Sequence, residues 1–156
     1  MKLRSISCPV LLVGMGLLAG CGSAQNSSDS SDSSASPSKA YFPCSLLTFQ
    51  EVAASQNEQV QAAQPMPPDQ CAYPGQDPMD VVTVKAAKSG AKALFQTEKS
   101  QATGTPITGV GDEAFWVQSV LYVRKGDAYA AIDMTKAPGD VQGGGLNLAK
   151  IAAGRL

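Results

Sequence analysis

Residues 113–134, EAFWVQSVLYVRKGDAYAAIDM, decide the fold expected for this chain. They hold three runs rich in β-branched and aromatic residues, separated by short polar breaks: 113–118, 120–125 and 128–134. In the middle run, the apolar Leu121 and Val123 alternate with residues that favour the opposite, more polar face. Residues 125–127, Lys-Gly-Asp, form a turn into the last run. The stretch therefore predicts an antiparallel meander of three strands.

The rest of the chain adds helices on either side of this meander. Thr48 and Glu51 form a Thr-x-x-Glu capping box, which predicts a helix ending at Asn57 with Phe49 and Val52 facing the core. The other predicted elements are strands at 71–73 and 80–86, a helix at 89–101 capped by Ser89 with Leu94 and Phe95 inward, a flexible break at 143–145, and a last helix capped by Asn147. Residues 64–70 and 104–111 read as loops. Helices segregated from an antiparallel sheet indicate an α+β fold.

The N-terminal end has a different character. A basic start at Lys2 and Arg4 precedes an apolar run, residues 6–18, and then the sequence Leu-Ala-Gly-Cys ending at Cys21. This arrangement resembles a bacterial lipoprotein signal, in which cleavage before Cys21 leaves a cysteine that carries acyl chains. The resemblance implies that the exported chain is anchored to the outer surface of the plasma membrane, or to an outer membrane, without spanning it. A secreted protein cleaved by the ordinary signal peptidase is the alternative.

The N-terminal pattern divides the chain into three parts. Residues 1–20 are the signal peptide, residues 21–39 are a tether, and residues 40–156 are one domain. Serine makes up half of residues 22–39, and such a segment buries too little apolar surface to offset its ordering entropy. Without the signal peptide, 10 basic residues face 13 acidic ones, a net charge of −3 that gives no basic patch for nucleic acid.

Two cysteines remain for the exported domain. Cys8 leaves with the signal peptide and Cys21 carries the lipid, so Cys44 and Cys71 are left in an oxidising compartment. The chain contains no histidine, which weighs against a zinc site and against a cysteine nucleophile activated by a neighbouring base. The sequence therefore predicts a Cys44–Cys71 disulfide, with no metal or cofactor.

Several polar residues are candidate catalytic or ligand-binding groups. The glycine-rich residues 109–113 could cradle a phosphate or bind a cation, but a turn leading into a strand explains them better. A pair of carboxylates could support glycoside hydrolysis, although no pair stands out among the acids. Ser89 and Lys92 have a spacing suited to serine–lysine chemistry, but Ser89 is better explained as a cap. No catalytic residue is predicted.

A binding surface is the more favoured prediction. Tyr122 and Arg124 share the strand face opposite Leu121 and Val123, and either Phe115 or Trp116 must share it. Tryptophan, tyrosine and arginine dominate the energetics of many interfaces. If this face is open to solvent, a patch of Trp116, Tyr122 and Arg124 is a candidate binding site; if a helix covers it, these residues belong to the core and the sheet edge.

The order of the motifs resembles a known family. The motifs are Cys44-Ser45-Leu46-Leu47-Thr48 with Glu51, Cys71-Ala72-Tyr73, Gly109-Val110-Gly111-Asp112-Glu113-Ala114-Phe115, Val123-Arg124-Lys125-Gly126, Leu148-Ala149-Lys150 and Arg155-Leu156. Together they look like a family of small bacterial lipoproteins, frequent in actinobacteria. The resemblance implies a lipid-modified cysteine, a serine-rich tether, one disulfide and an α+β domain, but no activity.

The sequence thus favours a membrane-anchored, non-enzymatic module that binds a protein, a glycan or a small ligand in the cell envelope. The alternatives are an enzyme acting on envelope polymers and an accessory or sensory subunit of an envelope receptor.

Overall fold

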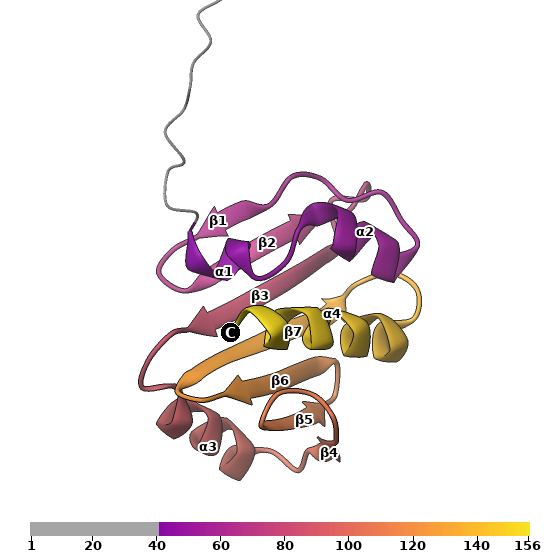
Figure 1. Cartoon of the computed structure of the whole chain (residues 1–156). Coiled ribbons are helices and arrows are strands. Elements are labelled where there is room, and N and C mark those ends of the chain that lie inside the picture. Colours follow the sequence, from indigo (N-terminus) through magenta and orange to yellow (C-terminus); the bar gives the residue numbers. More distant parts are fainter. Residues whose placement is uncertain (1–40) are drawn as a thin grey trace, which may run out of the picture. The chain divides into compact units, whose positions relative to one another are not determined.

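The computed structural model describes residues 41–156, which form four helices and seven strands (Figure 1). In chain order these are α1 (Phe42–Ser45), α2 (Phe49–Gln56), β1 (Gln64–Met66), β2 (Gln70–Pro74), β3 (Val81–Ala87), α3 (Ala91–Gln101), β4 (Thr105–Ile107), β5 (Glu113–Val117), β6 (Val120–Lys125), β7 (Ala128–Lys136) and α4 (Val141–Arg155). The predicted α+β class is confirmed.

All seven strands join one antiparallel sheet in the order β1-β2-β3-β7-β6-β5-β4. The predicted meander of β5, β6 and β7 is present, with β4 added at its edge. A second meander, β1-β2-β3, joins it where β3 pairs with β7. The short edge strands β1 and β4 lie within two segments that were predicted as loops, because edge pairing of three residues leaves no clear period in the sequence.

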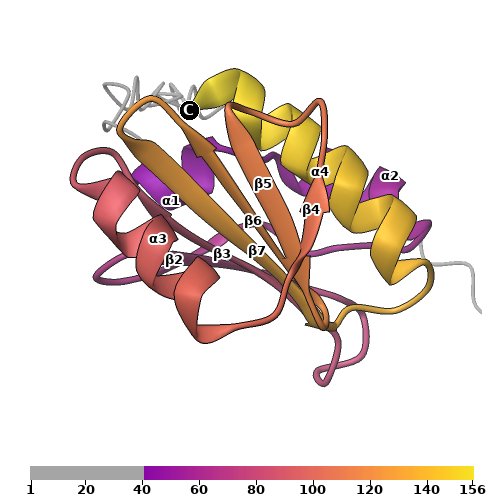
Figure 2. The same cartoon turned by 90° about the horizontal axis from the view of Figure 1, so that it is seen from below.

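Helices cover the two faces of the sheet unequally. The helices α1, α2 and α4 lie on one face, where the larger apolar core includes Leu121, Ile132 and Leu148 (Figures 1 and 2). Only α3, among the described helices, lies on the other face (Figure 2). There it buries Phe95 against Phe115 and Tyr129, next to β6 and β7. The part of this face beyond α3 has no helix over it.

The predicted capping box begins α2. The Thr48 side chain accepts a hydrogen bond from the Glu51 backbone N–H, and the Glu51 carboxylate accepts one from the Thr48 N–H. Asn57 ends the helix in the left-handed conformation. Val52 is buried as predicted, but Phe49 is 40% exposed, because it occupies the first turn on the solvent side. The prediction that Phe49 faces the core is wrong.

Glu51 also joins the two ends of the domain. Its carboxylate receives two hydrogen bonds, of 2.6 and 2.7 Å, from the Arg155 guanidinium, which also donates to the Leu46 carbonyl oxygen. The Arg155 hydrogen bonds, aided by those from Thr48, lower the pKa of Glu51 from 4.5 to about 2. Arg155 is the last residue of α4, so this ion pair ties α4 to the start of α2.

Acid is therefore expected to weaken the domain through Glu51. A carboxyl group whose pKa is lower in the folded state contributes stability above its unfolded pKa and loses that contribution as the pH falls toward its folded pKa. For Glu51 the window runs from about pH 4.5 down to about pH 2. Because the Glu51 side chain is about a quarter exposed, we expect a contribution of about 1–2 kcal/mol.

Urea denaturation at a series of pH values will test this. The difference in the free energy of unfolding between the wild type and Glu51→Gln should shrink between pH 4.5 and pH 2. A constant difference across that range would contradict the role given to the Glu51–Arg155 pair.

The glycine run 143–145 lies inside α4 and does not break it. The Asp140 carboxylate accepts a hydrogen bond from the Gly143 N–H at 3.0 Å, so α4 begins six residues before the predicted cap, Asn147. A Cβ atom at Gly144 would lie 2.8 Å from the Ser55 carbonyl oxygen, and one at Gly145 would lie 2.8 Å from the Trp116 ring. The glycines therefore allow α4 to pack closely on α2 and β5. The predictions of a flexible break and of an Asn147 cap are both wrong.

The start of α3 also differs from the prediction. Ser89 makes no capping hydrogen bond, and Gly90 occupies the cap position with a φ of 66°. The Asp127 carboxylate, on the turn between β6 and β7, accepts a hydrogen bond from the Gly90 N–H at 2.9 Å. Phe95 is fully buried as predicted, whereas Leu94 is 47% exposed. A distant turn therefore takes the place of the predicted Ser89 cap.

The predicted disulfide joins Cys44 to Cys71. It links α1 to the buried side of β2. Nearby, the buried Tyr73 hydroxyl donates a hydrogen bond to the Leu47 carbonyl oxygen at 2.8 Å. These two connections hold the segment that contains α1 against the first meander.

Candidate functional site

The predicted patch of Trp116, Tyr122 and Arg124 does not form one surface. In the register of β5 and β6, Trp116 is opposite Leu121, so it lies on the face that carries the larger core. Tyr122 is opposite Phe115 and lies on the α3 face. Because successive residues of a strand point to opposite faces, Trp116 and Phe115 could not share one face. The prediction therefore assigned the wrong aromatic residue to the face of Tyr122.

Trp116 instead lines a small apolar pocket beside α4. Its volume is about 320 Å³, and Ile107, Leu121 and Leu146 contribute most of the apolar lining. The Trp116 indole N–H donates a hydrogen bond to the Gln118 carbonyl oxygen, and its ring lies against Gly145. These contacts give Trp116 a packing role at the edge of the core.

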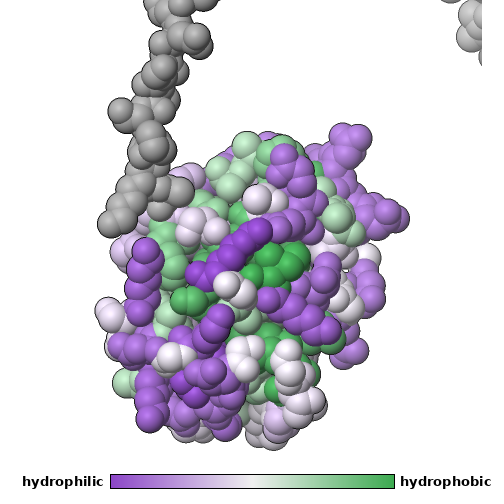
Figure 3. Space-filling view, in the orientation of Figure 1, coloured by the Kyte–Doolittle hydropathy of each residue, from purple (hydrophilic) through white to green (hydrophobic). Residues whose placement is uncertain are grey.

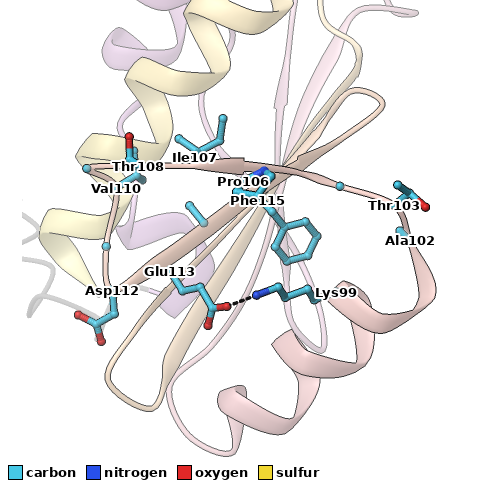
Figure 4. A pocket seen from close by; sticks show the side chains of 14 residues that line it. Lys99, Ala102, Thr103, Pro106, Ile107, Thr108, Val110, Asp112, Glu113 and Phe115 are labelled. Atoms are coloured by element: carbon cyan, nitrogen blue, oxygen red, sulfur yellow. Dashed lines mark hydrogen bonds and ion pairs between the residues drawn. The ribbon is translucent and has the colours of Figure 1, made fainter.

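Another cavity of the described domain lies under the loop that joins β4 to β5, and we call it the loop pocket. Its volume is about 500 Å³, and the glycine-rich residues 109–113 form one wall. Figure 4 shows Lys99 on α3 reaching across to Glu113 at the start of β5, while Asp112 points away from that pair. Judged by its lining residues alone, the loop pocket resembles a charged binding site.

Protein groups already satisfy the charges around the loop pocket. Glu113 pairs with Lys99 and Arg124, and the Lys99 hydrogen bond is the main cause that lowers the pKa of Glu113. Asp112 accepts a hydrogen bond from the Gly126 N–H at 2.7 Å and lies 3.4 Å from the Arg124 guanidinium. Gly111 has a φ of 58°, as a tight turn requires. The explanation of residues 109–113 as a turn leading into a strand agrees with this geometry.

Arg124 is therefore a structural residue at one end of the sheet. Its guanidinium also donates a hydrogen bond to the Gly126 carbonyl oxygen at 2.8 Å, and its side chain is only 16% exposed. It joins the loop before β5 to the turn after β6.

Tyr122 borders a different surface, the part of the α3 face that no described helix covers. Two adjoining cavities of about 330 and 370 Å³ lie there and share Thr83 and Asp133. We call them the sheet groove; its polar lining is Gln70, Thr83, Lys85, Glu98, Tyr122, Asp133, Thr135 and Lys136. Each cavity has the size of a small-molecule site.

Small residues make the floor of the sheet groove. One row of cross-strand neighbours runs from Tyr122 through Ala131 and Lys85 to Gln70. The next row runs from Val120 through Asp133 and Thr83 to Ala72. Because Ala131 and Ala72 are small, the surface is lower at these two positions than at the larger side chains beside them.

The polar side chains of the sheet groove come from separate elements. Glu98 reaches it from α3, Asp133 from β7, and Thr83 and Lys85 from β3. Burial, followed by the negative charges of Glu98 and Asp133, raises the pKa of Tyr122, so that its hydroxyl stays protonated at neutral pH. Lys85 lies 3.8 Å from Asp69 at the rim. The sheet groove therefore offers hydrogen-bond donors and acceptors along one aromatic wall.

The sequence interpretation missed most of these residues. It identified Tyr122 but not Gln70, Thr83, Lys85, Glu98 or Asp133. A signal was present, because alternation places Thr83 and Lys85 on one face of β3, and Ala131 and Asp133 on one face of β7. That these two faces adjoin depends on the pairing of β3 with β7, which joins distant parts of the chain.

Other predictions concern parts that the structure does not describe. Cys21, the signal peptide and the tether at 21–39 lie outside residues 41–156. Within residues 41–156, no helix has the length and apolar character needed to cross a membrane. In the same region, no three His, Cys, Asp or Glu side chains are grouped so that they could hold a metal ion.

Comparisons with protein-family models, with curated proteins and with solved structures found no match, so the likeness to the lipoprotein family stays a prediction.

Proposed function

We propose that this chain is a lipid-anchored, non-enzymatic module that binds a cell-wall polymer of the bacterial envelope through the sheet groove. The observation that carries this proposal is the part of the α3 face without a helix over it, where polar side chains surround Ala131 and Ala72. Ligand sites combine a concave surface with a few polar groups that fix orientation.

The sheet groove is favoured over the loop pocket because its two carboxylates stand outside the ion pairs of the described residues; Asp133 accepts a hydrogen bond from the Thr135 N–H at 2.8 Å, a neutral donor. In the loop pocket, Lys99, Arg124 and the two neighbouring acids neutralise one another. In the sheet groove, Glu98 and Asp133 make no ion pair among the described residues. A ligand can therefore hydrogen-bond to these carboxylates without first breaking a salt bridge.

The proposed location at a membrane surface rests on the N-terminal sequence. Acyl chains on Cys21 would hold the chain at a membrane surface, and the serine-rich residues 22–39 would let the domain reach the wall beside it. A polymer fixed in that space suits a groove that is open along its length.

Sedimentation with purified peptidoglycan sacculi will test this proposal. The chain is made from residue 22 onward; this form keeps the disulfide and the core, which lie within residues 41–156. We expect it to sediment with sacculi, and Thr83→Arg, which fills the groove, to weaken binding at least about tenfold, or about 1.4 kcal/mol. Ala54→Arg adds the same charge on exposed α2, across the sheet, and should bind like the wild type.

Two results would contradict the proposal. Failure of the wild type to sediment with sacculi would remove the assigned ligand, and equal binding by Thr83→Arg would remove the assigned site.

A carboxylate-based hydrolase is the second candidate, because Glu98 and Asp133 line the same cavity. Release of soluble fragments from sacculi by the wild type, and its loss in Glu98→Gln, would favour this enzyme over the binding module.

A further inference from the structure

We infer that Tyr122 is a stacking platform for a sugar ring, so that the sheet groove recognises the glycan part of the polymer. This inference rests on the proposed function and names the chemistry that the groove selects. It follows from three features of the groove: the aromatic wall, the polar groups above the floor, and the mixed charges.

The aromatic wall is built in advance and held in place. The Tyr122 ring stacks on Phe115 with a centroid distance of 4.7 Å and an interplanar angle of 8°. Phe115 in turn meets the ring of Phe95 edge to face, with centroids 5.0 Å apart. Phe95 belongs to α3, so the helix fixes the orientation of both rings. A ligand that uses this wall has little side-chain entropy to pay on binding.

The groove borders Tyr122 on the side away from Phe115. Phe115 covers one face, and the cross-strand neighbour on the other side is Ala131, which is too short to cover the ring. The face of an aromatic ring carries partial negative charge. The C–H bonds on one side of a pyranose ring carry partial positive charge and form a flat surface, so a sugar complements this wall in shape and charge.

The polar groups of the groove suit a ligand with many hydroxyl groups. Glu98 and Asp133 accept hydrogen bonds, whereas Thr83 and Gln70 can both donate and accept. A sugar hydroxyl also donates and accepts, and can satisfy either kind of group.

The mixed charges of the groove favour an uncharged ligand over other envelope molecules. Lys85 and Lys136 line the two cavities together with Glu98 and Asp133, and Asp69 lies 3.8 Å from Lys85 at the rim. A polyphosphate chain would meet both carboxylates without a net attraction. An acyl chain would have to cover four charged groups and leave them without water. An uncharged glycan avoids both costs.

The tetramer of β-1,4-linked N-acetylglucosamine is the probe for this inference. Titration of the ¹⁵N-labelled chain from residue 22 should shift amide signals of β3, β6 and β7 in the groove. Tyr122→Ala should weaken binding about fivefold to tenfold, the size of an aromatic contact of about 1–1.5 kcal/mol. Tyr122→Phe keeps the ring and should stay within about threefold of the wild type.

The outcomes separate the inference from the proposed function. If sacculi bind but the tetramer does not, the polymer is recognised through its peptides, and only the inference fails. If neither binds, both fail. The inference is also overturned if Tyr122→Ala, with an unchanged amide spectrum elsewhere, binds the tetramer like the wild type, or if Tyr122→Phe binds as weakly as Tyr122→Ala. Since the mapping uses the wild type, it remains decisive even if Tyr122→Ala does not fold.

Discussion

Removing the Cys44–Cys71 disulfide is expected to lower the free energy of unfolding by about 3–4 kcal/mol. The two cysteines are 27 residues apart, and the bond restricts the unfolded chain between them. That segment includes α2, β1 and the start of β2, so the bond constrains much of one side of the domain. For a domain of this size, such a loss is a large part of the total stability.

Alanine variants measure this effect best. Cys71 is fully buried, and serine there would add the separate cost of an unpaired hydroxyl group. Cys44→Ala, Cys71→Ala and the double variant should have similar denaturation midpoints in urea, all well below that of the wild type. A reducing agent should lower the midpoint of the wild type and leave the double variant unchanged. Additive losses from the two single variants would show that the residues act independently.

Replacing Phe95 by alanine is expected to cost about 3–5 kcal/mol, the range for a buried phenylalanine. Phe95 is fully buried and is the main apolar anchor of α3, packing on Phe115 and Tyr129. Without it, α3 keeps only Ala91 as a fully buried contact with the sheet. We therefore expect α3 to separate from the sheet before the rest of the domain unfolds.

Leu94→Ala is the matched control, because Leu94 is the preceding residue of α3 and is 47% exposed. It should cost less than about 1 kcal/mol. Hydrogen exchange will show whether the amides of α3 lose protection in Phe95→Ala while those of β3 and β7 keep theirs. Similar losses in the two variants would contradict the anchoring role. Since Phe95 also orients the Phe115–Tyr122 stack, Phe95→Ala should weaken glycan binding as well.

Several predictions that depend on neighbouring residues were confirmed. The capping box of Thr48 and Glu51 acts within one turn of helix, so its sequence is sufficient to predict it. The strands around Val82, Leu121 and Ile132 follow from β-branched residues and alternation, which are also local. The disulfide was predicted from a count, because Cys44 and Cys71 remain once Cys8 and Cys21 are assigned to the predicted lipoprotein signal.

Predictions failed where a distant group replaced the local one. Asp127 takes the place of Ser89 at the start of α3, from a turn 37 residues away. The glycines before Asn147 suggested a break, but they are required by the close approach of α2 and Trp116 to α4. The two partners of each contact lie far apart in the chain, so a local sequence pattern cannot predict the contact.

The sequence by itself determined the class of fold, the disulfide and the local starts and ends of several elements, because each depends on residues close together in the chain or on a count. Only the tertiary structure decided which strand faces meet and which helix covers them. The pairing of β3 with β7 brings Thr83 and Lys85 beside Ala131 and Asp133, and the short α3 leaves that surface uncovered. The sheet groove exists for this physical reason: its residues are neighbours across strands and not along the chain.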